Sequence, residues 1–395
     1  MNLTKVALLF SKGNKAQFDM SSAEQRNVLE RLGDPKDDID RSLKQYLCQM
    51  SFMPAWKKLG LNMLAIAAFP LEVLYYFVKG IKTIQTEPVE AAAIFKEVEA
   101  VIPEELKKRY AIKSDCTFDE YSLSFSDLSF ISYLLFRGLL HPFFVLKSTA
   151  NVAKYSSLIK RYRPKCVMVH AEFAFSSSLL TRYCHSKGVE HINVMHGEKL
   201  YYIRDSFFHY DECFVWDQYY IDLFTSLKAE PSQFRIAVPK SMVIDVNQYL
   251  NESLFADYKY YLARCTPVEL ESIVNSMHFV RNIGKTVKFR PHPRWTDMSL
   301  LESLVPKEEI EYPAEVNIMQ SVANSSYAVG SYTTVLTQAV HSGRGVVLDD
   351  ITYKEQYEKL KDLKYILSNK GYPTLSELQA KGSVSTTISN LKNYA

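Results

Sequence analysis

One hexapeptide, Arg290–Pro291–His292–Pro293–Arg294–Trp295, gathers the residue types best suited to bind a phosphate. It directly follows the apolar run at 286–289, which predicts a β-strand. Two prolines restrict the backbone beside His292, so we expect a rigid loop that presents one imidazole between two guanidinium groups. Arginine binds phosphate through paired hydrogen bonds. The hexapeptide therefore indicates a phosphate site, and the alternative is a proline-bent strand end with exposed cations.

A cluster of hydroxyl groups gives a second candidate anion site, in the segment Gly330–Ser331–Tyr332–Thr333–Thr334. This segment lies between a short predicted strand at 327–330 and a predicted helix at 335–342. Backbone N–H groups at a helix N-terminus attract anions, and side-chain hydroxyls can add hydrogen bonds there. N-capping alone would use one hydroxyl, whereas every residue from Ser331 to Thr334 carries one. We therefore favour ligand binding over capping alone.

Two tripeptides could move protons. His196–Gly197–Glu198 follows a predicted strand at 191–195, and His170–Ala171–Glu172 ends a predicted strand at 165–170. An imidazole or a carboxylate at such a position could act as the general base that deprotonates an acceptor hydroxyl. The alternative is that each glutamate begins a helix, where the helix dipole favours a carboxylate.

The elements that position these motifs are short apolar strands alternating with helices, at 165–238 and again at 258–348. Strands that are apolar throughout are typical of a parallel sheet covered by helices. We therefore predict an α/β fold with two Rossmann-like domains. In such sheets ligands bind at the carboxyl ends of the strands, where all four motifs lie.

The predicted domain boundaries follow from this alternation. The first domain is placed at 1–235, with an opening strand at 5–10 and a helical insertion at about 20–160. The second domain is placed at 236–375, and a C-terminal helix at 376–395 follows it.

Composition excludes several classes of protein. The net charge of +3 over 395 residues is too small to indicate a nucleic-acid-binding surface. The chain contains no CxxC, HExxH or EF-hand pattern, so neither a metal site nor another cofactor is expected. It also lacks the glycine patterns of dinucleotide-binding, P-loop and α/β-hydrolase enzymes. Six scattered cysteines in a chain of this length fit a reducing cytoplasm.

Two apolar stretches, at 59–78 and 128–146, approach the length of a membrane span. Both contain polar or charged residues, such as Glu72 and Arg137, which would be costly inside a bilayer. We favour two core or interface helices over true spans. A third interpretation is a surface that rests on a membrane, with aromatic and lysine side chains at its rim.

Three of these motifs, together with a fourth segment, resemble in their order along the chain those of bacterial glycosyltransferases of the two-domain GT-B fold. The set consists of His196–Gly197–Glu198, the segment Trp216–Asp217–Gln218–Tyr219–Tyr220, the His292–Pro293 loop and the Ser/Thr turn. The resemblance is greatest to the group that uses cytidine nucleotide donors, and it covers roughly residues 165–350. That group includes bacterial sialyltransferases and polysialyltransferases, capsule Kdo transferases and CDP-glycerol glycerophosphotransferases.

The resemblance implies two Rossmann-like domains facing across a cleft, with the nucleotide donor bound by the second domain. His292 and Pro293 match the His-Pro motif that contacts the nucleotide. Ser331, Thr333 and Thr334 match the positions that hold the donor phosphate or the sugar carboxylate.

The resemblance leaves the identity of the base open. Glu198 lies where sialyltransferases carry their acidic base, but the order here is His-Gly-Glu instead of acid-acid-Gly. His196 matches the histidine of a His-Gly motif in the glycerophosphotransferases. Glu172 is the third candidate, because it follows a neighbouring strand.

The implied activity is transfer of an acidic sugar, with sialic acid as the leading donor, from a CMP-sugar to a glycan or lipid-linked glycan. No metal would be needed, and the product would enter capsule, O-antigen or lipooligosaccharide synthesis. Donor and acceptor would meet at the inner face of the cytoplasmic membrane, where the chain would be peripherally attached. One alternative is a related GT-B transferase that uses CDP-glycerol or a UDP- or GDP-hexose. The other is a non-catalytic subunit of glycan assembly.

Overall fold

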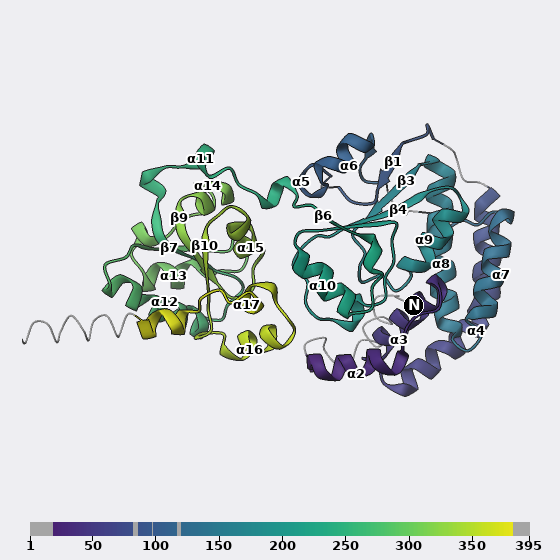
Figure 1. The fold of residues 1–395 in the computed structure, drawn as a ribbon, viewed down its shortest axis with the longest axis horizontal. Coiled ribbons are helices and arrows are strands. Elements are labelled where there is room, and N and C mark those ends of the chain that lie inside the picture. The colour runs from purple at the N-terminus through teal and green to yellow at the C-terminus, as the bar shows by residue number, and fades with distance from the viewer. Residues whose placement is uncertain (1–18, 82–85, 97, 117–119, 382–395) are drawn as a thin grey trace, which may run out of the picture. The chain divides into compact units, whose positions relative to one another are not determined.

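The computed structural model describes residues 19–81, 86–96, 98–116 and 120–381 (Figure 1). The chain divides into two units, residues 1–239 and 240–395. The strand predicted at 5–10 and most of the helix predicted at 376–395 lie outside the described residues.

Unit 1 is built on one sheet of six strands in the order β2-β1-β3-β4-β5-β6, and every neighbouring pair is parallel. The four strands β3 to β6 lie where the apolar runs predicted them. The strands are β1 Ala91–Ala93, β2 Ile112–Lys113, β3 Cys166–Val169, β4 Glu190–Val194, β5 Glu212–Val215 and β6 Phe234–Ile236.

The strands β1 and β2 interrupt the segment that we predicted as a helical insertion, so that prediction is wrong in part. All three alanines of β1 are fully buried, and β1 pairs with β2 on one side and with β3 on the other. Alanine favours helices and is depleted in strands. The strand therefore depends on its pairing with β2 and β3, which local sequence does not reveal.

The helices of unit 1 surround this sheet (Figure 1). The longer ones are α2 Ser22–Leu32, α3 Asp38–Met50, α4 Ala55–Ile81, α7 Leu128–Arg137, α8 Pro142–Tyr162, α9 Ser177–Ser186 and α10 Gln218–Ser226. Two short helices, α5 Val98–Val101 and α6 Glu104–Arg109, lie between β1 and β2.

Helix α3 holds neighbouring segments of unit 1 in place. Polar side chains on its buried side make hydrogen bonds to backbone groups that water would otherwise satisfy. Ser42 Oγ accepts the N–H of Leu179 in α9 at 2.9 Å. Gln45 Nε2 donates to the backbone carbonyls of Glu172 at 2.8 Å and Arg204 at 2.9 Å. The chain that leaves β3 is thereby anchored to α3.

The two apolar stretches form different elements in the structure. The stretch at 59–78 lies within the 27-residue helix α4, whereas the stretch at 128–146 is divided between α7 and the start of α8. Helix α4 is long and apolar enough to cross a membrane, and only 17% of its apolar window is buried in the structure. Of the two alternatives in the prediction, a core or an interface helix, the core alternative is therefore wrong for α4.

Unit 2 has one sheet of four parallel strands in the order β10-β9-β7-β8. Helix α12 (Pro267–Asn282) begins with a capping box between Thr266 and Glu269, as its sequence leads one to expect. Its apolar side joins the strands in a single core. The strands are β7 Ala256–Tyr261, β8 Val287–Arg290, β9 Ser325–Gly330 and β10 Gly345–Leu348.

The strand order reverses once in each described sheet. In unit 1 the chain runs from β1 to β2 on one side and then to β3 on the other side of β1; in unit 2 it runs from β7 to β8 and then to β9 in the same manner. Open α/β sheets bind ligands outside the carboxyl ends of the strands at such a switch point. The predicted α/β class with two Rossmann-like parallel sheets, as in the GT-B fold, is confirmed.

Candidate functional site

Three residues meet at the switch point of unit 1. The ring of His170, directly after β3, stacks on Phe95, which follows β1, with ring centroids 3.7 Å apart. The ring of His196, which follows β4, lies 4.6 Å from that of His170. The structure thus brings together the two histidine motifs that the sequence placed on neighbouring strands.

The imidazole of His170 is held in one tautomer. Its Nδ1 lies 2.5 Å from the carbonyl oxygen of Val194, so Nδ1 carries the proton and donates it. Burial lowers the pKa of His170 to about 4; the Val194 carbonyl opposes this shift and the neighbouring His196 adds to it. At neutral pH the ring is therefore uncharged, and its Nε2 can accept a proton or a hydrogen bond.

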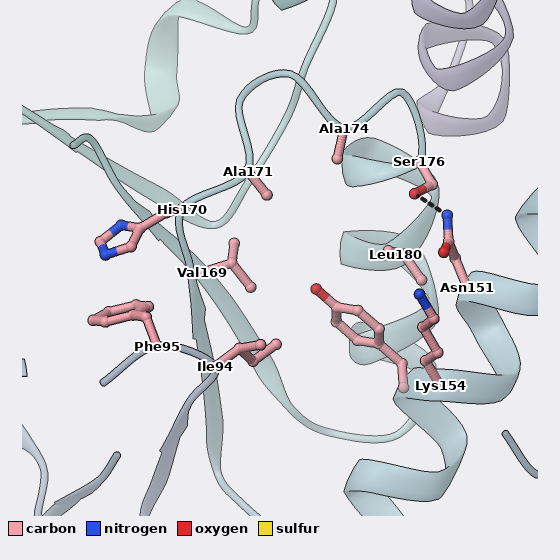
Figure 2. A pocket seen from close by; sticks show the side chains of 11 residues that line it. Ile94, Phe95, Asn151, Lys154, Val169, His170, Ala171, Ala174, Ser176 and Leu180 are labelled. Atoms are coloured by element: carbon pink, nitrogen blue, oxygen red, sulfur yellow. Dashed lines mark hydrogen bonds between the residues drawn. The ribbon is translucent and has the colours of Figure 1, made fainter. Parts of the chain in front are cut away.

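A pocket of about 240 Å³ opens beside His170. Figure 2 shows His170 and Phe95 on one side of it, with Asn151 and Lys154 of α8 on the other. Asn151 Nδ2 donates to Ser176 Oγ at 2.8 Å. The lining thus combines an ammonium group, a neutral imidazole and amide and hydroxyl groups with apolar walls, which suits a hydroxyl-rich molecule that carries an anionic group.

Glu198 is half-buried in the loop after β4 and belongs to no helix, so the interpretation as a helix start is wrong. Gly197 allows the turn, with φ at +69°. Tyr220 Oη, in α10, donates to Glu198 Oε2 at 2.6 Å. Such a hydrogen bond favours the charged carboxylate and fixes its direction. The His-Gly-Glu and Trp-Asp-Gln-Tyr-Tyr motifs are therefore in direct contact.

Glu172 lies too deep to act on a substrate directly. It is fully buried, and its Oε2 is 3.1 Å from Nζ of Lys199, which is itself 7% exposed. Burial raises the pKa of Glu172, but the charge of Lys199 and hydrogen bonds to the carboxylate outweigh this effect, so the pKa lies below its ordinary value. The position favours a structural ion pair under the loop after β4, which leaves Glu198, His196 and His170 as candidates for the base.

In unit 2, the loop after β8 presents His292 as a hydrogen-bond donor. The backbone N–H of Arg294 donates to His292 Nδ1 at 3.1 Å, and the backbone N–H of His292 donates to Thr296 Oγ1 at 2.8 Å. Because Nδ1 accepts, the neutral ring carries its proton on Nε2. The ring is partly exposed, and Pro293 follows it in the exposed part of the loop. This geometry fits a hydrogen bond from Nε2–H to a phosphate or ribose oxygen.

The two arginines of this loop have different surroundings. Arg290 is 8% exposed, and its Nη1 lies 2.8 Å from Oε1 of Glu311. The other oxygen of Glu311 is paired with the fully buried Lys259. Because a buried guanidinium needs its counter-ion, this position argues against the predicted phosphate contact of Arg290. Arg294 is exposed to solvent.

The Ser/Thr turn lies at the switch point of unit 2, between β9 and α15 (Thr334–His341). Thr333 is the N-cap of α15, and its Oγ1 accepts the N–H of Val335 at 3.4 Å. The capping interpretation therefore holds for Thr333. Ser331 Oγ donates to Gln356 Oε1 at 3.4 Å, and Thr334 is exposed at the first position of the helix. The turn thus offers two further hydroxyls beside the N-terminal N–H groups.

Sequence reasoning missed three residues of this site. Phe95 escaped because β1 was not recognised. His170 was noted only as part of a motif, since a glutamate two residues later appeared the better base. Tyr220 was named only as part of the Trp-Asp-Gln-Tyr-Tyr segment, although the presence of that segment beside His-Gly-Glu was a usable signal. Among the residues that the structure describes, no group of three or more His, Cys, Asp or Glu side chains could hold a metal ion.

Comparison with known proteins finds no matching family model and no matching curated protein. Solved structures do match, at low identity. One is the glycotransferase of kitacinnamycin, with a TM-score of 0.45 and 10% identity over 75% of this chain and 90% of that one. Another is the H548A variant of the wall teichoic acid polymerase TagF, with a TM-score of 0.44 and 11% identity over 84% and 88%.

A putative UDP-N-acetylglucosamine 2-epimerase from Listeria monocytogenes also matches, with a TM-score of 0.40 and 12% identity over 69% of this chain and 82% of that one. All three TM-scores are below 0.5. We therefore base the fold on the strand order and the functional proposal on the geometry of the two switch points.

Proposed function

We propose that this chain is a GT-B glycosyltransferase that transfers a sugar from a nucleotide donor to a hydroxyl group of a glycan, in the synthesis of a bacterial surface polysaccharide. One observation carries the proposal: the two switch points are equipped for different halves of one reaction. Unit 1 offers groups that accept a proton, and unit 2 offers groups that donate hydrogen bonds to an anion.

Unit 2 is proposed to bind the nucleotide. When the bond from sugar to phosphate breaks, negative charge grows on the phosphate, and fixed hydrogen-bond donors stabilise that charge. His292 Nε2–H, the hydroxyls of Ser331 and Thr334 and the N-terminal N–H groups of α15 are such donors. The exposed guanidinium of Arg294 adds a positive charge.

Unit 1 is proposed to bind the acceptor and to take up its proton. Glu198 is our first choice for the base, because it is partly exposed and Tyr220 fixes the direction of its carboxylate. His196 is the second choice, and the neutral His170 beside it is the third. The pocket beside His170, whose lining includes Lys154, would hold the acceptor glycan.

For the donor we propose a CMP-activated acidic sugar, with sialic acid leading. The support is the His292–Pro293 motif followed by the Ser/Thr turn, in the order that the cytidine-donor families share. The alternatives remain CDP-glycerol or a UDP- or GDP-hexose as donor, and a non-catalytic subunit of glycan assembly. As part of the same proposal, transfer needs no metal and takes place at the inner face of the cytoplasmic membrane.

A transfer assay tests this proposal. The protein is incubated with CMP-sialic acid, CDP-glycerol, UDP-glucose or GDP-mannose and a polysaccharide extract, with and without EDTA, and release of nucleotide is measured. We expect release from CMP-sialic acid that EDTA leaves unchanged and that Glu198→Gln lowers by about 10²–10⁴-fold. Nucleotide release from UDP-glucose alone would show that the donor is a UDP-hexose and not a CMP-sugar. Release from none of the four donors would favour the non-catalytic alternative.

The chain contains a matched control for Glu198. Glu190, on the opposite end of β4, accepts a hydrogen bond from Tyr110 Oη just as Glu198 accepts one from Tyr220. Glu190→Gln should therefore remove the charge from the same kind of contact without affecting nucleotide release. Equal losses in the two variants would show that the effect on activity is structural.

A further inference from the structure

Unit 1 has an apolar surface that the other described residues of this unit leave uncovered. It is formed by α4, by α7 and by the turn that follows α7, and we call it the α4–α7 face. Three of its residues come from α4 and three from α7 or the turn, and each is more than half exposed: Leu64, Leu71, Leu74, Phe136, Leu139 and Leu140. Soluble monomers rarely expose a continuous apolar patch of this extent, so the face is expected to contact another apolar phase.

The attachment of α4 decides how it could meet a membrane. Asn62 Oδ1 accepts the N–H of Phe143 at the start of α8, and the carbonyl of Tyr76 accepts the N–H of Leu123, each at 3.0 Å. Leu61, Ala65 and Tyr76 are buried. The two hydrogen bonds are 14 residues, or about 21 Å, apart along the helix. A span would have to break both, whereas a helix lying on the membrane surface keeps them.

The charges around the face are complementary to an anionic surface. The stretches 55–81 and 128–147 leave three cationic side chains at least partly exposed, Lys58, Lys79 and Lys147, against a single acid, Glu72. Lys57 is buried, and Arg137 pairs with Asp37 at 2.5 Å, so neither is counted. The carboxylate of Glu72 accepts a hydrogen bond from Tyr76 Oη at 2.6 Å, which ties it to its own helix. Lysine and arginine beside an apolar helix face favour membranes that contain anionic lipids.

The face is also hollowed by an apolar groove. A pocket of about 330 Å³ lies between α4 and the α7–α8 turn, and its lining includes Ile66, Phe69, Leu135 and Leu139. No charged side chain lines it. A groove of this composition suits a hydrocarbon chain better than water or a sugar.

We propose that the α4–α7 face inserts into one leaflet of a bilayer that contains anionic lipids, with α4 parallel to the membrane plane. The attachment is thus monotopic: the chain lies in the membrane surface through α4 and α7 and does not cross it. This inference is independent of glycosyl transfer, because it concerns a surface of unit 1 that contains none of the candidate catalytic residues.

Tryptophan fluorescence tests the orientation directly. The chain has three tryptophans, and Trp295→Phe leaves Trp56 on α4, which is 68% exposed, and the buried Trp216. In that background we compare Trp56 with the variant Trp56→Phe/Leu71→Trp. Position 56 precedes the apolar stretch at 59–78 and the exposed position 71 lies near its middle, so a span would place the first at the interface and the second deep in the bilayer. The probes are vesicles of phosphatidylglycerol and phosphatidylcholine that carry bromine at a shallow or a deep position of the acyl chain.

We expect shallow bromine to quench both tryptophans equally and deep bromine to quench both weakly. Different depths at the two positions would indicate a span and would overturn the proposal. Absence of quenching in anionic vesicles would overturn it as well. Equal binding to pure phosphatidylcholine vesicles would overturn the requirement for anionic lipid.

Co-sedimentation with the same vesicles tests the face itself. Leu71→Glu/Leu74→Glu should lower the bound fraction by at least about tenfold, since charges are costly below the headgroups. The matched control is Leu250→Glu, an exposed leucine of unit 2, which should bind as the unmodified chain does. If the Glu variant instead turns a dimer into a monomer in sedimentation equilibrium while vesicles bind neither form, the face joins two copies and the proposal is wrong. Nucleotide release, measured in parallel, keeps this outcome separate from that of the proposed transferase activity.

Discussion

The two units use the same strand order for different chemistry. Each sheet reverses its order beside its first described strand, β1 in unit 1 and β7 in unit 2. In unit 1 the reversal is surrounded by titratable groups, His170, His196 and Glu198. In unit 2 it is surrounded by hydroxyls, a helix N-terminus and an imidazole that presents an N–H. The scaffold thus determines where a ligand binds, and the loop residues determine what is done to it.

The units also resemble each other beneath these loops. Each holds a carboxylate in a buried ion pair: Glu172 with Lys199 in unit 1, and Glu311 with Lys259 and Arg290 in unit 2. These pairs fix the last residues of the strands and the loops that follow. Removing the carboxylate leaves one buried cation in unit 1 and two in unit 2, which makes the comparison testable.

The largest effect is expected from Glu311→Ala. Because this change leaves two buried cations without a counter-ion, it should lower the free energy of unfolding of unit 2 by about 3–5 kcal/mol. Glu172→Ala leaves one cation and should cost unit 1 less. Denaturant unfolding followed by circular dichroism measures both. A larger loss in Glu172→Ala would contradict the account of unit 2 as the more strongly ion-paired unit.

The next largest effect is expected in the pH dependence of the stability of unit 1. His191 is 1% exposed, and its ring nitrogens form hydrogen bonds with Tyr155 Oη at 2.9 Å and Thr181 Oγ1 at 2.8 Å. Burial lowers the pKa of His191 from 6.5 to about 3. Above pH 6.5 neither state binds this proton. As the pH falls from 6.5 toward 3, the unfolded chain binds a proton that the folded chain refuses, so stability is lost by up to about 1.4 kcal/mol per pH unit.

The measurement for His191 is denaturant unfolding between about pH 7 and pH 4.5, followed by the fluorescence of the buried Trp216 of unit 1. His191→Gln keeps hydrogen-bonding groups but does not titrate, so it should flatten the slope. An unchanged slope in that variant would assign the acid sensitivity to other groups.

A smaller effect is expected at the contact between the two unit 1 motifs. Tyr220→Phe removes the hydrogen bond to Glu198 and should lower kcat by about tenfold. Steady-state kinetics measure this loss. Tyr110→Phe, which removes the equivalent donor to Glu190, is the control and should leave kcat unchanged. An equal loss of kcat in the two variants would mean that the effect of Tyr220→Phe is structural.

The smallest effects should separate capping from binding in the turn of unit 2. Thr333→Ala removes the N-cap of α15 and should cost about 1 kcal/mol of stability. Thr334→Ala, at an exposed position, should cost under about 0.5 kcal/mol but weaken nucleotide binding. Thermal unfolding with and without nucleotide measures both quantities. Equal nucleotide affinities in Thr334→Ala and the unmodified chain would show that the turn serves only as a helix cap.

The two units were not equally predictable from the sequence. In unit 2, the runs at 286–289 and 327–330, each followed by a polar segment, predicted β8 and β9 and placed both motifs at carboxyl ends. In unit 1, β1 is three alanines, so its strand comes from pairing across the sheet and no local pattern reveals it. The switch point of unit 1, and with it Phe95, could not be located without that strand.

Side-chain roles were harder to predict than positions. Arg290 and Arg294 look alike in the sequence, but the alternation of β8 and its loop buries the first against Glu311 and exposes the second. Glu172 and Glu198 occur in similar tripeptides, yet Lys199 holds the first in the interior and Tyr220 orients the second. Such differences depend on partners that are distant along the chain, which a motif does not contain.

A thermal-shift screen against CMP, CDP, UDP and GDP tests the division of roles between the units most directly. Ligand at about 100 times its dissociation constant adds about 2.7 kcal/mol to the folded state, which the method resolves. We predict that CMP raises the Tm of the unmodified chain, of Glu198→Gln and of the control His278→Ala, an exposed histidine of unit 2, but not of His292→Ala. A shift that survives in His292→Ala and disappears in Glu198→Gln would place the nucleotide in unit 1 and contradict the account.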